Sequence, residues 1–251
     1  MNPPVDPPVD PTVDPAVDPP VNPAPGPAPR TAVGLDRARR ELRAGRAVVL
    51  PNPAPLTHVV AAITAPAVNA AKGRPADQPV ALWAHHADTL DTLAGLWDLA
   101  PADHGPVRRL HLTVLLPLRP DTVRPSWSDP AVKDGWMLLF GARWKPLRPL
   151  LDDHPLLYVS SANLTGRPPA ADTAGALAMF PATVPVLRPP DPGRPPDPGD
   201  DGPAPTARQA TTTVRVLPRG GLRLHRPGAQ DRAYGPPEAY LRDLYARTFR
   251  R

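Results

Sequence analysis

The sequence predicts an α/β layer fold preceded by a proline-rich arm. Apolar runs typical of buried strands, AVVLP (47–51), LHLTVLLPL (110–118) and LLYVS (156–160), alternate with segments in which apolar residues recur at helical spacing. Such alternation is typical of folds in which helices pack on a sheet. The chain has 251 residues, enough for one large or two small domains.

Residues 1–30 are predicted to form a disordered arm. From residue 3 they repeat a four-residue unit, PPVD, PPVD, PTVD, PAVD, PPVN, PAPG, PAPR. Proline at every fourth position or closer excludes a helix, and the repeat has too few apolar residues to bury a core. We therefore expect an extended, polyproline-like segment. A solubilising tail and a docking segment for a partner are both open interpretations.

The body is expected to span residues 31–230. GLDRARRELRAG (34–45) places Leu35, Ala38 and Leu42 on one helical face, with Gly45 as a C-terminal cap. After the strand at 47–51, further elements are expected in this order: a helix at 88–99, strands at 110–118 and 156–160, a helix at 173–180 and a strand at 211–218. Residues 189–209, rich in proline, glycine and aspartate, predict a flexible insert. Residues 231–251 are expected to form a helical tail that docks on the body.

Composition excludes several classes of site. The chain has no cysteine, which rules out disulfides, zinc–thiolate sites and a cysteine nucleophile. It shows neither a signal-peptide pattern nor an apolar run of about 18–20 residues, so we expect a cytoplasmic protein without a membrane segment. Because residues 1–30 contribute −3 to a net charge of +5, the remainder carries +8. A basic body suits an anionic partner such as a nucleotide or RNA, although frequent use of arginine on the surface explains it equally well.

Small polar side chains gather where the predicted strand 156–160 ends. The segment YVSSANLTGRPPA (158–170) contains Ser160, Ser161, Asn163 and Thr165. Strand ends of α/β folds bind ligands, and serine or asparagine can hydrogen-bond a phosphate, carboxylate or base at close range. The alternative is that these residues only cap a turn or the following helix.

Two cationic turns are further candidates. In AAKGRPADQPV (70–80), Lys72 and Arg74 flank a glycine, and Pro75 prevents a helix from continuing. Lysine as a point charge and arginine as a planar fork suit a polyphosphate. In RPGAQ (226–230), Arg226 follows a strand-like run and could reach a phosphate. Ordinary surface charge and ordinary turn chemistry are the respective alternatives.

Other catalytic and metal motifs are absent. The sequence contains no GxxxxGK[ST], HExxH, GxSxG or glycine-rich dinucleotide fingerprint. His85 and His86 are adjacent, so on a strand or a helix they would point to different sides and form a poor metal pair. No metal ligands are therefore predicted.

Together and in this order, these stretches resemble the threonylcarbamoyl-AMP synthase family, which is built on a YrdC-type domain. The matching stretches are AVVLP, KGRPADQP, LTVLLP, GARW, YVSSANLTGRPP, TTTV and LRLHRPGA, and they cover the body from 31 to 230. The combination of SSANLTG after a strand with KGRP upstream is specific. The resemblance implies a YrdC-like α/β fold, an open, twisted, mixed sheet flanked by helices, with a positively charged cavity.

The resemblance also implies a reaction. Threonine, bicarbonate and ATP would give threonylcarbamoyl-AMP and pyrophosphate, for modification of a tRNA adenosine beside the anticodon. Since a carbamate oxygen attacks the α-phosphate, the protein supplies positioning and electrostatics rather than a nucleophile. Magnesium is expected with the triphosphate. Transfer RNA or another double-stranded RNA is a further expected partner.

The resemblance assigns roles motif by motif. Lys72 and Arg74 would be the catalytic pair, facing ATP and the carbamate. The nucleotide would contact Lys72, Thr113, Asn163 and Arg226, and threonine would contact Ser161 and Thr211.

The chain departs from the family pattern after its first strand. Where the family carries Pro-Thr-acid-Thr-x-Tyr-Gly-Leu, this chain reads PNPAPLTH (51–58), with Asn52 for the first threonine, Ala54 for the second and Leu56 for the tyrosine. RRLH (108–111) stands where Trp-Pro-Gly-Pro is usual. Two alternatives to the synthase therefore remain: a catalytically decayed module that binds nucleotide or double-stranded RNA, and carbamoyl transfer to a different acceptor.

Overall fold

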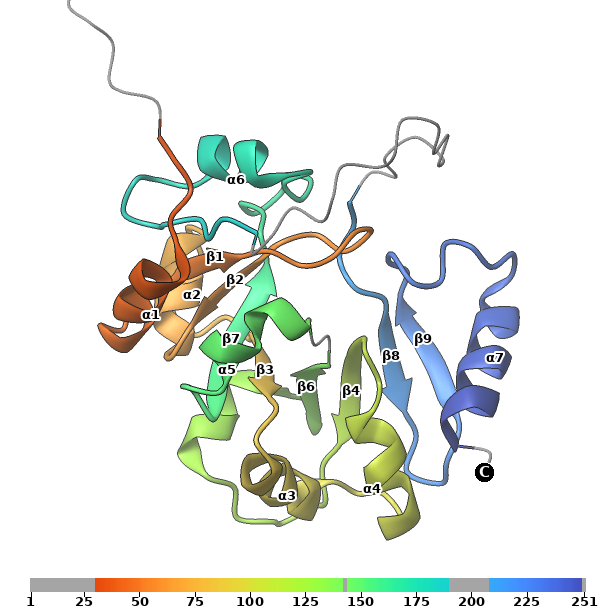
Figure 1. Ribbon diagram of the computed structural model, residues 1–251. Helices are drawn as coiled ribbons and strands as arrows, with labels where there is room; N and C mark the ends of the chain where they lie inside the picture. The colour runs from red at the N-terminus through yellow and green to blue at the C-terminus, as the bar shows by residue number, and fades with distance from the viewer. Residues whose placement is uncertain (1–29, 142–143, 190–207, 250–251) are drawn as a thin grey trace, which may run out of the picture.

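The computed structural model describes residues 30–141, 144–189 and 208–249. Within them, nine strands form one mixed sheet with helices on both faces (Figure 1). The arm predicted at 1–30, except Arg30, and most of the insert predicted at 189–209 lie outside the described residues. The strands are β1 (Val48–Leu50), β2 (Val59–Ala62), β3 (Ala81–Ala84), β4 (Thr113–Pro117), β5 (Val132–Lys133), β6 (Trp136–Phe140), β7 (Leu156–Ser161), β8 (Thr213–Val216) and β9 (Leu222–Arg226). The α-helices are α1 (Leu35–Arg43), α2 (Ala65–Ala71), α3 (Ala87–Leu96), α4 (Pro101–Arg108), α5 (Arg148–Leu151), α6 (Thr173–Met179) and α7 (Pro237–Phe249).

The sheet has the order β1-β2-β7-β3-β6-β4-β8-β9, with β5 paired to β6. Two neighbouring pairs, β3–β6 and β4–β8, are parallel, and the other pairs are antiparallel. The predicted open, mixed sheet flanked by helices is therefore confirmed. β7 lies inside the sheet between β2 and β3; its last residues, Ser160 and Ser161, pair with β2 only, because the pairing with β3 ends at Val159.

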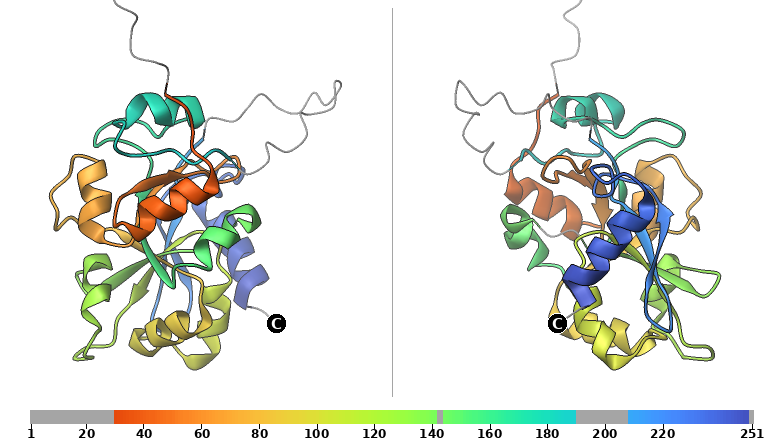
Figure 2. Two further views of the ribbon diagram at one scale, coloured as in Figure 1. Left: turned by 60° about the vertical axis from the view of Figure 1, so that its left-hand side comes forward. Right: turned by 90° about the vertical axis from the view of Figure 1, so that its right-hand side faces the viewer.

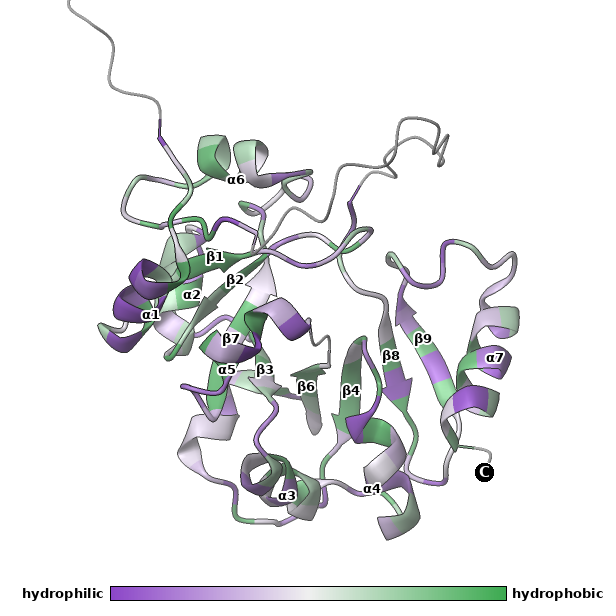
Figure 3. Ribbon diagram, in the orientation of Figure 1, coloured by the Kyte–Doolittle hydropathy of each residue, from purple (hydrophilic) through white to green (hydrophobic). Residues whose placement is uncertain are grey.

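Alternating side chains build two cores on the two faces of the sheet (Figure 3). On β2, Val60 and Ala62 belong to one cluster, and Val59 and Ala61 to the other. The first cluster includes residues of α2, α3, α4, α6 and α7, whereas the second is closed mainly by α1 and α5. The second cluster reaches β6 at Phe140 and contains no residue of β4, β8 or β9. That face of the sheet has less apolar cover toward β4 and β8.

The elements expected from apolar patterns are present with shifted ends. The helices expected at 88–99 and 173–180 are α3 and α6, and the strands expected at 110–118 and 211–218 are the shorter β4 and β8. The sequence reading did not assign β2, β3, β6 or α4. The three strands are only four or five residues long, and neither β2 nor β3 alternates with polar residues because both of its faces are buried.

Helix α7 packs along β9 and also contacts α4 (Figure 2). Its Tyr240 and Leu244 are buried in the first core cluster, and Tyr234 stacks edge-on against Tyr240. These contacts give the C-terminal segment a fixed position on the body. Among the described residues, no helix is both long enough and apolar enough to cross a membrane.

Candidate functional site

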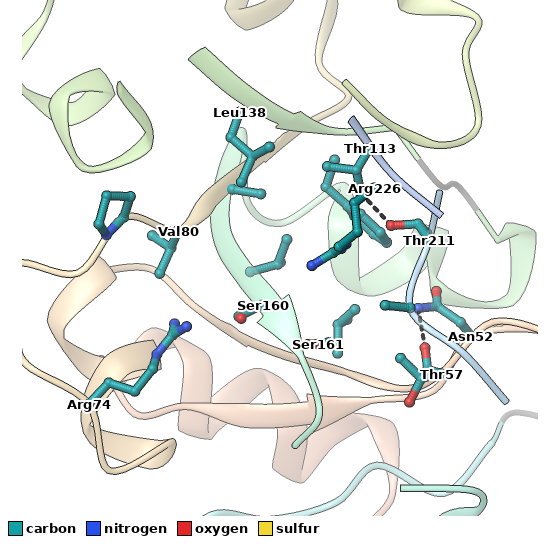
Figure 4. A pocket seen from close by; sticks show the side chains of 16 residues that line it. Asn52, Thr57, Arg74, Val80, Thr113, Leu138, Ser160, Ser161, Thr211 and Arg226 are labelled. Atoms are coloured by element: carbon teal, nitrogen blue, oxygen red, sulfur yellow. Dashed lines mark hydrogen bonds between the residues drawn. The ribbon is translucent and has the colours of Figure 1, made fainter. Parts of the chain in front are cut away.

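A cavity of about 180 Å³ lies on the sheet face that α1 and α5 cover only in part. Its floor is apolar, with Val59, Ala81, Leu138, Phe140 and Val159 from β2, β3, β6 and β7. Its rim is polar and comes from strand ends and loops: Asn52, Thr57, Arg74, Thr113, Ser160, Ser161, Thr211 and Arg226 (Figure 4). A second, more open cavity of about 420 Å³ adjoins it and shares Ser161, Ala210 and Arg226. Together they offer room for a large ligand and a small one.

Two arginines enter the first cavity from different sides, with the serines of β7 between them (Figure 4). Arg74 donates one hydrogen bond to Asn69 Oδ1 at 2.7 Å, and its buried Nε has no hydrogen-bond partner among the described residues. Burial lowers the pKa of Arg74. The side chain of Arg226, the last residue of β9, has no hydrogen bond or ion pair to any residue that the structure describes. Among the described residues, no aspartate or glutamate lines either cavity, so this part of the site is suited to an anion.

Asn69 organises the turn that carries Arg74. This fully buried asparagine donates to the main-chain oxygens of Ala76 and Gln78 and accepts from Arg74. Gly73 has φ of 63°, a left-handed conformation that glycine adopts without steric cost. The sequence patterns did not predict this role of Asn69, although a polar residue within the otherwise apolar segment APAVNAA indicates a buried hydrogen-bonding position.

Lys72 does not line either cavity. Its side chain is 3 % exposed, and its ammonium donates to the main-chain oxygens of Ser161 and Asn163 and to Asn163 Oδ1. A lysine has three donor protons, so all are used inside the protein. Burial, with a smaller contribution from the charge of Arg74, lowers the pKa of Lys72 to about 7. Lys72 thus fixes the end of β7 through these hydrogen bonds without lining the cavity.

The hydrogen-bonding groups of the Asn163 side chain are likewise paired within the protein. Its Oδ1 accepts from Lys72 and from Ser161 Oγ at 2.6 Å, and its Nδ2 donates to the main-chain oxygens of Leu164 and Arg167. It lines the second cavity rather than the first. The SSAN segment is therefore a rigid network, and its small side chains leave space beside the strand.

Thr113 and Thr211, which the resemblance assigned to different substrates, are hydrogen-bonded to each other through their hydroxyls. Both are buried and line the first cavity. Thr113 comes from the start of β4, and Thr211 lies two residues before the start of β8, the parallel neighbour of β4. Thr113, the expected nucleotide contact, and Thr211, the expected threonine contact, are thus adjacent near the starts of β4 and β8.

The segment at 51–58, where the chain departs from the family pattern, forms part of the cavity wall. Asn52 Nδ2 donates to the main-chain oxygen of Thr57, and Thr57 Oγ1 donates to that of Ala170. Arg208 holds the same loop by donating to the main-chain oxygens of Asn52 and Leu56. Most polar groups of this wall are used internally. His58 is 1 % exposed, and burial, together with the nearby positive charge of Arg208, lowers its pKa to about 4.

The turn after Arg226 packs directly against residues 210–212, the segment that precedes β8. Gln230 Oε1 accepts from Thr212 N, and Thr212 Oγ1 donates to Asp231. A Cβ placed on Gly228 would lie 2.4 Å from Thr212 N and 2.6 Å from Ala210 O, so only glycine permits this approach. The RPG sequence therefore sets where Arg226 enters the cavity.

The structure brings five of the seven predicted site residues together around the first cavity: Arg74, Thr113, Ser161, Thr211 and Arg226. Asn163 lies beside the second cavity, and Lys72 lies behind the strand. Ser160, Asn52 and Thr57 also line the first cavity and had no predicted role.

The expectation that His85 and His86 point to different sides is wrong. They lie in the turn between β3 and α3, where neither strand nor helix periodicity holds. Their rings are 4.7 Å apart in an edge-on arrangement, and a ligand atom of each lies within 4.8 Å of the other and of an Asp152 oxygen.

Comparisons with known proteins identify the fold. No protein-family model matches the chain, and no curated protein matches it in sequence. Among solved structures, P. abyssi Sua5 complexed with L-threonine is similar, with a TM-score of 0.54 and 18% identity over 76% of this chain. Full-length HypF in its phosphate- and nucleotide-bound form has a TM-score of 0.54 and 15% identity over 79% of this chain. E. coli YciO has a TM-score of 0.50 and 12% identity over 80%.

The extent of each match differs. This chain spans 53% of the Sua5 chain and 25% of the HypF chain, but 92% of YciO. At these identities the similarity establishes the architecture. The chain has the YrdC-like fold that Sua5, YciO and part of HypF share.

Proposed function

We propose that this chain is an ATP-dependent carbamoyl-adenylate synthase that acts on threonine. The threonine amine and bicarbonate would condense to a carbamate with loss of water, and an oxygen of this carbamate would attack the α-phosphate of ATP. A new bond between the carbamate oxygen and phosphorus forms, the bond to the β-phosphate oxygen breaks, and pyrophosphate leaves. No protein group needs to form a covalent intermediate.

The observation that carries the proposal is the convergence of Arg74 and Arg226 on one cavity, whose lining contains no acidic residue within the described part of the chain. An unpartnered guanidinium beside small hydroxyl residues provides unused donors for a polyphosphate. The larger adjoining cavity would take the nucleotide, and the smaller one the carbamate. Because no carboxylate of the residues that the structure describes lines either cavity, magnesium would be held by the triphosphate and water.

The fold supports the same proposal. It is shared with Sua5, which has been crystallised with L-threonine, and with HypF in a phosphate- and nucleotide-bound form. Ser161 and Thr211 lie on the rim nearest the 51–58 segment and would contact the amino acid. Lys72, with its donors used internally, would act as a positioning residue for Ser161 and Asn163.

A second candidate, carbamoyl transfer to another acceptor, is favoured by the 51–58 wall. Asn52 and Thr57 bond to main-chain oxygens, and Leu56 replaces the family's tyrosine. Fewer polar groups are then free to recognise an amino acid.

One experiment separates these functions and the decayed module. Calorimetry with ATP tests the nucleotide site, and pyrophosphate release is then measured with bicarbonate and each of the twenty amino acids. Release that depends on threonine supports the synthase. Release with a different acceptor favours the second candidate, and ATP binding without any release leaves the decayed module.

A further inference from the structure

A cluster of three metal-ligand side chains lies away from the cavity, at the opposite end of β3. His85 directly follows this strand, His86 caps the N-terminus of α3, and Asp152 caps the C-terminus of α5. Ala81 at the start of β3 lines the cavity, and a strand rises about 3.3 Å per residue, so His85 lies roughly 13 Å farther along. The proposed carbamoyl chemistry does not use this cluster.

The distances suit a shared ion. Each of the three residues contributes one ligand atom, and all three atoms lie within 4.8 Å of one another. His85 Nε2 and Asp152 Oδ1 are 3.1 Å apart. Two ligands bound at about 2.0–2.2 Å to one ion are separated by about 3–3.5 Å, so this pair already has the required spacing. The ligand atom of His86, within 4.8 Å of the other two, would complete the set.

His86 lacks a partner that would explain its orientation. Its Nε2 is buried and has no hydrogen-bond partner among the residues described. Its ring is held edge-on to His85, at 81°. Its backbone is extended (φ −68°, ψ 136°), as expected for a residue that caps the following helix.

His85 Nε2 and Asp152 Oδ1 contact each other directly, and an ion would replace this contact by binding both atoms. Arg148 Nε lies 3.7 Å from Asp152 Oδ2, the oxygen that does not face His85. The Arg148 side chain is 76% exposed and can turn into solvent. Asp152 is itself 55% exposed, which gives an ion a route from solvent.

We propose that His85, His86 and Asp152 bind one divalent transition-metal ion of the zinc, cobalt and nickel class. Two imidazoles with one carboxylate suit these ions better than calcium or magnesium, which prefer oxygen ligands alone. Three protein ligands leave at least one coordination position for water or another ligand. The ion would join the β3–α3 turn to α5.

The test is calorimetric titration of ZnCl₂ into the untagged, metal-free full-length chain. We expect one zinc ion per chain with micromolar or tighter affinity, and an affinity at least tenfold weaker in both His86→Ala and Asp152→Asn. His104→Asn is the matched control, because His104 is a half-buried histidine outside the cluster, and it should bind zinc like the wild type. Cobalt should give visible absorption bands in the wild type and the control that both cluster variants lose.

Three results would overturn the proposal: no stoichiometric zinc binding, binding that both cluster variants retain unchanged, or equal loss in His104→Asn. Because Asp152 is exposed, Asp152→Asn should fold and keep the wild-type circular dichroism. If His86→Ala does not fold, the zinc affinity of Asp152→Asn alone tests the proposal. The aspartates of residues 1–30 are unchanged in every variant, so weak binding there cannot produce the expected difference.

Discussion

Lys72 and Asn163 are joined by two hydrogen bonds, from the Lys72 ammonium to the main-chain oxygen of Asn163 at 2.5 Å and to its Oδ1 at 3.1 Å. They come from the two motifs, KGRP and SSANLTG, whose combination marked the family resemblance. The bonds explain why the motifs occur together: one supplies the buried cation that fixes the conformation of the other. A residue that sequence motifs assigned to ATP thus has a structural partner within the chain.

Lys72→Met should reduce both stability and nucleotide affinity. The substitution leaves the main-chain oxygens of Ser161 and Asn163 without their donor in a buried setting, at a cost of about 1–3 kcal/mol in unfolding free energy. The loosened SSAN segment should weaken ATP binding at least tenfold. Urea unfolding and calorimetry measure the two effects, with exposed Lys133→Met as the control. Unchanged ATP affinity in Lys72→Met would refute the positioning role.

Arg226→Ala should weaken ATP binding at least tenfold without loss of stability. The Arg226 side chain makes no hydrogen bond or ion pair to a described residue, so its removal should change the unfolding free energy by less than about 0.5 kcal/mol. Arg223→Ala removes an exposed arginine from the same strand and serves as the control. Equal ATP affinity in the two variants would argue against a phosphate role for Arg226.

Gly228→Ala should be destabilising, because its Cβ would overlap the backbone at 210–212. We expect a loss of about 1–3 kcal/mol in urea unfolding, as in overpacked interiors, together with weaker ATP binding. Gly235→Ala is a matched control, since a Cβ there would meet no atom within 4 Å. If both variants unfold at the same urea concentration as the wild type, the result would contradict the close approach of Gly228 to the backbone at 210–212.

Acidification should destabilise the protein through His58. Its folded pKa of about 4 lies below the ordinary value of 6.5, so the unfolded chain binds the proton more tightly. The stability that neutral His58 contributes is complete above pH 6.5 and is lost as the pH falls toward 4. Between pH 7 and pH 5 the loss should be on the order of 2 kcal/mol at most. Urea unfolding of His58→Gln should show a smaller pH dependence, and an identical one would exclude His58 as the cause.

Binding to double-stranded RNA, expected from the basic composition and the resemblance, should depend steeply on salt. Phosphate contacts release counterions, so the logarithm of the affinity falls linearly with the logarithm of the salt concentration. Fluorescence anisotropy between about 50 mM and about 200 mM salt measures the slope. A salt-independent affinity, or no binding at low salt, would contradict the expectation.

The sequence predicted the architecture because its longest apolar runs are strands inside the sheet. LLYVS and LTVLLP became β7 and β4, and the helix with Leu35, Ala38 and Leu42 became α1. The strands VVAA (β2) and ALWA (β3) were not recognised. Both of their faces are buried, which removes the alternation that identifies a half-buried strand.

The candidate site was predicted at the level of residues but not of orientation. Arg74, from the turn after α2, and Arg226, at the end of β9, line the same cavity from different parts of the fold, which local motifs and the sheet order together explain. That Lys72 points away from the cavity depends on acceptors 89 and 91 residues distant, which no local pattern encodes. The His85–His86–Asp152 cluster was missed for the same reason, because Asp152 comes from α5, 67 residues from His85 along the chain.

The most direct test of the central claim is the product itself. The full-length chain is incubated with ATP, Mg²⁺, threonine and ¹³C-bicarbonate, and threonylcarbamoyl-AMP is sought by mass spectrometry, with Arg74→Ala alongside. We predict a ¹³C-labelled adenylate and equimolar pyrophosphate from the wild type, and at least tenfold less of both from Arg74→Ala. Absence of the labelled adenylate from the wild type, or equal yields from the two proteins, would contradict the account.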